Sequence, residues 1–154
     1  MHGDARAFAA ALATERFVVQ LGDLTEHGPD SAGALNLMLE RLTAGRGLFL
    51  LGNHDLKLAR ALAGRQVRRD PTLIETLAAL DPALRERALA AIASAPAWLS
   101  VGRRFFVHGG FHTGMLASKA PPAPIEGPVS GLLARALYGE TTGRMQPDGY
   151  PDVG

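Results

Sequence analysis

The hydrophobic positions of this chain fall into blocks whose spacing predicts strands and helices in alternation. Two short apolar runs, 16–22 and 47–51, are rich in Phe, Val and Leu and resemble buried strands. Between them, leucine and methionine recur at helical spacing over 31–43, directly after the candidate cap Asp30. A further helix is expected at 5–14. This order predicts a βαβ unit in which the helix between the strands covers the sheet.

The rest of the chain predicts a helical insert followed by a hairpin. The pattern stays helical from 56 to 95, with breaks at Gly64, Asp70-Pro71 and Asp81-Pro82. After this insert the pattern predicts, in order, a strand at 98–101, a turn at Gly102-Arg103, a strand that runs to Val107, an irregular proline-rich stretch at 120–128 and a helix at about 130–138.

Composition narrows the class of protein. With 154 residues, 47% of them hydrophobic, 20% charged and a formal net charge of +1, the chain is expected to bury one core as a single globular domain. No apolar stretch is long enough to span a bilayer, and no signal-like segment opens the chain, so we expect a cytoplasmic protein without a membrane partner. Basic residues are scattered, which argues against a strong nucleic-acid-binding patch.

Cysteine is absent, so disulfides and thiolate metal ligands are excluded, and any metal must be held by oxygen and nitrogen. Such donors follow three predicted strands: Asp23 after the first, Asn53-His54-Asp55 after the second and His108 after the last. Side chains at the carboxyl ends of parallel strands converge on one crevice. A carboxylate, an amide oxygen and imidazoles suit manganese, iron or zinc better than calcium.

Each of these features also has a simpler interpretation. Taken alone, a Gly-Asp or Asn-His-Asp sequence at a strand end is an ordinary polar turn, and only the combination in this order favours a site. Lys57 and Arg60, one helical turn apart, are expected to face solvent, with the phosphate side of the site as the alternative. Trp98 is expected to pack in the core, and His112 to lie in a solvated loop.

Three segments occur in an order that resembles a known enzyme family. They are Gly22-Asp23-Leu24-Thr25-Glu26-His27-Gly28, Gly52-Asn53-His54-Asp55 and Val107-His108-Gly109-Gly110. With His2-Gly3, they resemble the signature of the calcineurin-like metallophosphoesterases, in particular the bacterial serine/threonine protein phosphatase-like members. Segments 57–65 and 137–143 are similar to the phosphatase module of bacterial polynucleotide kinase-phosphatases. The resemblance covers essentially the whole chain.

The resemblance implies an α/β fold of the α/β/β/α sandwich type. The family signature begins with an aspartate where Met1 stands here, and it closes with a Gly-His pair that would follow Tyr150-Pro151. The chain is therefore expected to be truncated at both ends. Residues 1–154 are interpreted as a single, incomplete domain that carries a helical insert.

The resemblance also implies two divalent metal ions, with Mn2+ as the first choice and iron or zinc as alternatives. Asp23 would bridge both ions, His2 would complete the first site, and Asn53 and His108 would bind the second ion. A hydroxide that bridges the ions would attack phosphorus in line with the leaving oxygen. Because the first aspartate and the closing histidine are missing, each ion is expected to have lost one ligand.

His54 is the residue that the resemblance assigns to protonating the leaving group. Glu26, in place of the family's aspartate, would orient His54 and raise its pKa. His27 stands where the family has an arginine, and an imidazole offers fewer donors and titrates near neutrality. Asn53 and His27 are the candidate phosphate-binding residues, with weaker or pH-sensitive binding expected.

The implied function is the hydrolysis of phosphoesters, with three substrate classes open: phosphoproteins, dinucleoside polyphosphates and phosphorylated polynucleotide ends. No phosphate-binding loop of the kinase type occurs in the chain, so no kinase partner domain is expected. The alternative is a truncated or degenerate chain without catalysis that at most binds phosphate or a partner. Two tightly held ions would favour the enzyme, and one loose ion or none would favour the alternative.

Overall fold

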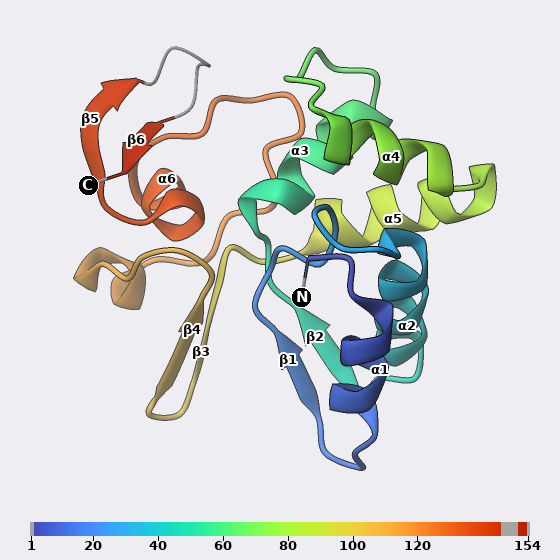
Figure 1. Cartoon of the computed structure of the whole chain (residues 1–154). Helices are drawn as coiled ribbons and strands as arrows, with labels where there is room; N and C mark the ends of the chain where they lie inside the picture. Colours follow the sequence, from blue (N-terminus) through green and yellow to red (C-terminus); the bar gives the residue numbers. More distant parts are fainter. Residues whose placement is uncertain (1, 146–150, 154) are drawn as a thin grey trace.

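A computed structural model describes residues 2–145 and 151–153 (Figure 1). Its helices are α1 (Ala5–Leu12), α2 (Ser31–Thr43), α3 (Asn53–Leu62), α4 (Pro71–Ala79), α5 (Pro82–Ser94), the 3-10 helix η1 (Thr113–Ala117) and α6 (Gly131–Tyr138). Its strands are β1 (Val18–Gln20), β2 (Gly47–Phe49), β3 (Trp98–Val101), β4 (Arg104–Val107), β5 (Thr141–Met145) and β6 (Pro151–Val153). Met1 and Tyr150, on which the expectation of truncated ends rests, lie outside the described residues.

The predicted βαβ unit is confirmed. Strands β1 and β2 pair in parallel, and α2 packs against β2 and α1 (Figure 1). Helix α2 has the predicted bounds because the Asp30 carboxylate accepts the N–H of Gly33 at 2.7 Å and caps the first turn. Strand β1 is shorter than predicted, because the side chain of Gln20 bonds both main-chain groups of Gly22 and takes the chain out of the sheet.

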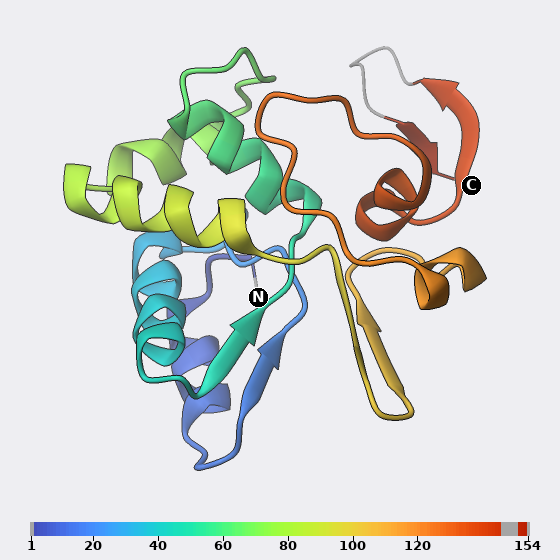
Figure 2. The same ribbon diagram turned by 180° about the vertical axis from the view of Figure 1, so that it is seen from behind.

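The helical insert is also confirmed. Asp70 and Asp81 cap α4 and α5 through the N–H groups of Leu73 and Leu84, and proline follows each cap at the first helical position. Figure 2 shows α5 across the end of α2, which it contacts. Helix α3 begins at Asn53, earlier than the sequence pattern indicated. The polar triplet Asn53-His54-Asp55 is therefore the first turn of a helix.

The predicted hairpin pairs β3 with β4 in antiparallel register, with Trp98 opposite Val107. Strand β4 thus reaches the site from a hairpin and not as a third parallel strand of the β1–β2 sheet. Two hydrogen bonds join the hairpin region to that sheet: the N–H of Leu51 donates to the carbonyl of Pro96 at 3.0 Å, and His108 Nδ1 lies 2.7 Å from the carbonyl oxygen of Leu21. The α/β class is confirmed.

One buried cluster runs through these elements, from Phe8 in α1 to Leu137 in α6. Trp98 belongs to it, as predicted, and His112 is exposed, as predicted. The core lies beneath the ends of β1 and β2 and the start of α3, so the loops that carry the polar residues rest on a packed base. Among the described residues, none of the helices combines the length and the apolar character that crossing a membrane requires.

Candidate metal centre

Two glycines allow the loops after β1 and β2 to touch. Gly22 has φ of 87°, and a Cβ there would lie 2.8 Å from Gly52 Cα and 2.8 Å from His108 Nδ1. No other residue could adopt that conformation in so little space. The close approach brings the loop that carries Asp23 against the start of α3 and against His108.

Asp55 holds this contact together. Its carboxylate, fully buried, accepts the N–H of Asp23 at 2.6 Å, of Leu24 at 3.0 Å and of Gly52 at 3.0 Å. Burial, and then the charge of Asp23, raise the pKa of Asp55 to about 6, against the three backbone donors. The interpretation of Asn53-His54-Asp55 as a metal and acid–base triplet is therefore wrong for Asp55, because its oxygens are taken up by backbone donors.

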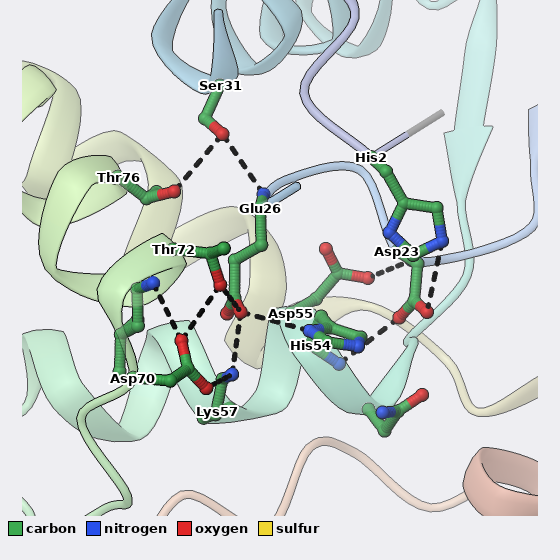
Figure 3. Close-up of polar contacts among 12 residues, drawn as sticks. His2, Asp23, Glu26, Ser31, His54, Asp55, Lys57, Asp70, Thr72 and Thr76 are labelled. Carbon is green, nitrogen blue, oxygen red and sulfur yellow. Dashed lines mark hydrogen bonds and ion pairs between the residues drawn. The ribbon is translucent and has the colours of Figure 1, made fainter. Parts of the chain in front are cut away.

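Around Asp23 the structure brings together the four predicted metal ligands. Asp23 Oδ2 lies 3.9 Å from His2 Nε2 (Figure 3). It also lies 3.3 Å from His108 Nε2, which in turn lies 3.1 Å from Asn53 Oδ1. Ligands that share one ion at bonds of about 2.1 Å lie roughly 3.0 to 3.5 Å apart. The spacing of Asp23, Asn53 and His108 fits one such ion, and their oxygen and nitrogen donors suit a borderline divalent metal.

The charge of Asp23 suits cation binding, whereas its pairing with His108 favours a protonated imidazole that a metal ion would have to displace. Burial alone would raise the pKa of the Asp23 carboxyl, but the hydrogen bond and the charge of His108, with the charge of His54, outweigh it and hold the pKa below its usual value. Burial likewise opposes protonation of His108, yet the hydrogen bond and charge of Asp23 raise its pKa. Asp23 is therefore ionised at neutral pH, as a bridging ligand must be.

Beside this centre, His54 and Glu26 form a pair. His54 Nδ1 lies 3.0 Å from Glu26 Oε2, and this hydrogen bond is the main cause of a raised His54 pKa. Burial would raise the pKa of Glu26, but hydrogen bonds from His54 and Lys57 outweigh it and lower the pKa. The backbone N–H of His54 donates to Asp23 Oδ1 at 3.1 Å, which ties the pair to the metal centre.

The expectation that Lys57 and Arg60 face solvent is wrong. Lys57 is only 8% exposed, and its ammonium group lies 2.6 Å from Glu26 Oε2 and 2.8 Å from Asp70 Oδ2 (Figure 3). Arg60 donates to the carbonyl of Pro124 at 3.0 Å and to that of Gly127 at 2.6 Å. The one local signal was that Lys57 stands between Leu56 and Leu58, both of them buried in α3.

His27 lies exposed at the rim of the site, edge-on to two other imidazoles. Its ring centroid is 5.0 Å from that of His54 and 5.6 Å from that of His2. Glu26, His27 and His54 have donor atoms within 4.8 Å of one another and could hold a cation. Lys57 already neutralises Glu26 at 2.6 Å, so this group is a poorer cation site than the one at Asp23.

The backbone of the site is strained. In the described part of the chain, the non-glycine residues with positive φ are His2, Asp23, Glu26 and His27, at 47°, 53°, 67° and 58°. Left-handed conformations of this kind cost of order 1 kcal/mol or more each and concentrate at functional sites. All four are residues that the sequence predicts to bind metal or substrate or to act in the reaction.

The family assignment follows from a comparison with known proteins. The profile of the family described as calcineurin-like phosphoesterase matches residues 1–132. The chain belongs to this family. As a calcineurin-like phosphoesterase it is a member of a family of metal-dependent hydrolases, as the motifs around Asp23, Asn53 and His108 predict. The match ends before 137–143, so the likeness of that segment to polynucleotide kinase-phosphatases stays a prediction.

Curated relatives of this calcineurin-like phosphoesterase carry nucleotide-hydrolase names. The asymmetrical bis(5'-nucleosyl)-tetraphosphatase PrpE of Geobacillus sp. (strain WCH70) is 28% identical over 140 residues, which cover 85% of this chain and 54% of that protein. PrpE of Halalkalibacterium halodurans is 28% identical over 145 residues, 88% of this chain and 55% of that protein. The symmetrical bis(5'-nucleosyl)-tetraphosphatase of Ralstonia nicotianae is 42% identical over 67 residues, 43% of this chain and 23% of that protein. The chain thus spans about half the length of the PrpE relatives that it matches.

Proposed function

We propose that this chain carries the metal-binding and proton-donating residues of a phosphoesterase that hydrolyses nucleotide phosphoesters. The observation that carries the proposal is the ring of donors around Asp23, formed by His2, Asn53 and His108 at distances of 3.1 to 3.9 Å from their neighbours. His54 stands beside it, with its Nδ1 engaged by Glu26. A metal centre adjoining a raised-pKa imidazole is what phosphoester hydrolysis requires.

Two divalent ions, Mn2+ by preference, would supply charge neutralisation of the phosphate and a nucleophile at neutral pH. Asp23 would contact both ions, with His2 on one side and Asn53 and His108 on the other. The ionised Asp23 provides the charge for this task, and the imidazoles of His2 and His108, once deprotonated, provide nitrogen donors.

His54 would act as the proton donor. Because Glu26 occupies Nδ1 at 3.0 Å, Nε2 is the nitrogen left to meet the leaving oxygen. The hydrogen bond to Glu26 raises the pKa of His54 and so favours the protonated form that a proton donor needs. Asn53 and the exposed His27 at the rim would hold the phosphate oxygens.

The substrates that we propose are dinucleoside polyphosphates. Support comes from the relatives, which are named as bis(5'-nucleosyl)-tetraphosphatases, and from the open, exposed rim at His27. None of these relatives is named as a protein phosphatase, so phosphoproteins have no support from them. The proposal of polynucleotide ends as substrates rests on the likeness of 137–143 alone.

We also propose that 1–154 belongs to a single domain, in line with its one continuous core. The cytoplasmic location stays a prediction from composition.

A second candidate is a chain that binds one ion and phosphate without turnover. It is favoured by the uneven donor set: the side chains of Asp23 and Asn53 lie 3.3 and 3.1 Å from His108 Nε2, whereas His2 Nε2 lies 3.9 Å from Asp23. An ion with two protein ligands is held more weakly than one with three, because fewer donors offset its dehydration.

The test is hydrolysis of para-nitrophenyl phosphate and of diadenosine tetraphosphate with added Mn2+. Asp23→Asn should abolish turnover, and Asp81→Asn, which keeps a capping oxygen on the surface of α5, should not. Calorimetric titration should give two Mn2+ per chain, with tight binding lost in Asp23→Asn. One weak ion and no turnover from folded protein would favour the second candidate, and turnover that survives Asp23→Asn would refute the proposed centre.

A further inference from the structure

We propose that Lys57 is a positioning residue for the reaction: its buried ammonium group holds the Glu26 carboxylate against His54 and links this pair to helix α4. The inference rests on the proposed function, in which His54 protonates the leaving group. It assigns a part in the reaction to a side chain of the helical insert that never touches the substrate.

The contacts converge on one oxygen atom. Glu26 Oε2 receives the ammonium group of Lys57 at 2.6 Å, His54 Nδ1 at 3.0 Å and the hydroxyl of Thr72 at 3.1 Å (Figure 3). The Glu26 side chain is completely buried, and Lys57 is nearly so. Lys57 and His54, both on α3, therefore fix the position of the carboxylate, while the Thr72 hydroxyl has one proton to share between Glu26 and the nearer Asp70 Oδ1 at 2.8 Å.

The buried Glu26 carboxylate needs a cation beside it in order to stay ionised. A buried carboxylate without one would take up a proton and would then no longer accept the His54 hydrogen bond as an anion. His54 cannot serve as that cation throughout the cycle, because it becomes neutral when it gives its proton to the leaving oxygen. Lys57 stays charged: burial works against its charge, but the hydrogen bonds to Asp70 and Glu26 outweigh burial and raise its pKa. Glu26 therefore remains an anion in both states of His54.

Lys57 is itself held in place from the other side. Asp70 Oδ2 lies 2.8 Å from its nitrogen, while Asp70 Oδ1 caps α4 through the N–H of Leu73 at 3.0 Å and accepts the hydroxyl of Thr72 at 2.8 Å. The same Thr72 hydroxyl reaches Glu26. The start of α4 and the proton donor thus share one hydrogen-bonded network.

Stability alone does not account for this buried ion pair. Burying two charges costs several kcal/mol, and apolar residues of similar size often serve as well or better in such a place. The surroundings of Lys57 on α3 are apolar, with Leu56, Leu58 and Ala61 all buried. Apolar residues at positions 57 and 26 together would fill this space without the desolvation cost of the pair. A role in orienting Glu26 explains why an ammonium group occupies the position.

The test compares two substrates that differ only in how much the leaving group needs a proton. Phenyl phosphate expels a basic phenolate, which requires protonation, and 2,4-dinitrophenyl phosphate expels an anion that leaves without one. General acid catalysis contributes about 10²- to 10⁴-fold. Lys57→Met should therefore lower kcat on phenyl phosphate by about 100-fold and on the dinitrophenyl ester by less than about threefold. The matched control is Lys119→Met, which removes the same charge from an exposed loop and should change neither rate.

Equal losses on both substrates, or no loss on either, would overturn the inference, because a purely structural defect does not distinguish leaving groups. Restoration of the ammonium group is a further check. The chain has no cysteine, so Lys57→Cys can be alkylated with bromoethylamine to place an ammonium group at this one position. Recovery of the phenyl phosphate rate is expected. If Lys57→Met does not fold, Asp70→Asn, which removes the charge that anchors Lys57, is judged by the same comparison of substrates.

A spectroscopic measurement separates this inference from the proposed function. In metal-free protein, nitrogen-15 NMR should find neutral His54 with its proton on Nδ1, where Glu26 accepts it, and Lys57→Met should shift the proton to Nε2. If the wild type hydrolyses neither ester, the proposed function fails and this measurement alone decides the role of Lys57. An unchanged tautomer in the variant would then refute it.

Discussion

Replacing Asp55 with alanine gives the sharpest test of how the site is built. Its carboxylate is the acceptor for the backbone N–H groups of Asp23, Leu24 and Gly52, all of them buried. Alanine would leave these three donors without that acceptor, at about 1 to 3 kcal/mol each, or roughly 6 kcal/mol together. The loop that carries Asp23 would lose its attachment to α3.

A second effect opposes this loss. Alanine also removes the cost of burying the carboxylate, and the rise of the Asp55 pKa from 3.8 to about 6 sets that cost at about 3 kcal/mol above pH 7. The donor effect is larger, so we expect Asp55→Ala to lower the free energy of unfolding by about 3 kcal/mol at pH 7.5. Folded Asp55 holds its proton between the two pKa values, so the ionisation cost is smaller at pH 5. The loss should therefore be about 1 kcal/mol greater there.

The assay is urea unfolding followed by the fluorescence of Trp98, the only tryptophan and a buried one, with EDTA present so that metal binding does not contribute. Asp81→Ala is the matched control, because it removes a single capping hydrogen bond at 2.8 Å and should cost about 1 kcal/mol. A loss in Asp55→Ala no larger than in Asp81→Ala would refute the reasoning, as would a smaller loss at pH 5 than at pH 7.5.

Three further predictions concern other parts of the chain. Burial works against the charge of Asp70, but the hydrogen bond from Lys57 and those from α4 hold its pKa well below the usual value. The ionised carboxylate therefore contributes stability above about pH 4, and this contribution is lost as the pH falls. The melting temperature should decline less steeply between pH 5 and 2 in Asp70→Asn than in wild type. A methyl group on Gly28 would overlap the carbonyl of His2, so Gly28→Ala should lower the free energy of unfolding by about 1 to 3 kcal/mol and weaken Mn2+ binding in calorimetry. Wild-type values for both quantities would contradict this close contact. Arg60→Met removes the hydrogen bonds to the carbonyls of Pro124 and Gly127, and limited trypsin digestion should then cut at Lys119 faster than in the control Arg103→Met, which changes an exposed arginine in a different turn.

The elements that the sequence predicted well are those whose signals are local. Helix α2 runs over the predicted 31–43 because its cap, Asp30, and its apolar spacing lie within the segment itself. The breaks at Asp70-Pro71 and Asp81-Pro82 became helix starts for the same reason. Three of the four predicted metal ligands, Asp23, Asn53 and His108, follow the end of a strand, whereas His2 is joined to the site by a hydrogen bond from its N–H to the carbonyl of Asp23.

The features that sequence reasoning missed depend on partners far away in the chain. Lys57 is buried because Glu26, 31 positions earlier, needs a cation, and Arg60 is bound by carbonyls 64 and 67 positions later. No local pattern encodes such pairs. The role of Asp55 could not be predicted because its partners are backbone N–H groups, and residue types do not show which of these groups will need an acceptor. The start of α3 was placed too late because three polar residues after a strand are also typical of a turn.

The left-handed backbone conformations of His2, Asp23, Glu26 and His27 reduce the thermal stability of the protein. Glycine fits such conformations without the steric penalty of a Cβ, so glycine at these positions would relieve strain. At the exposed His2 and His27, a selection for heat resistance alone would therefore tend to accept glycine and erase side chains of the site, whereas at Glu26 the loss of the buried pair with Lys57 would oppose glycine. Engineering of this protein for robustness should hold these four positions fixed and seek its gains elsewhere, since natural proteins commonly trade stability for activity at such places.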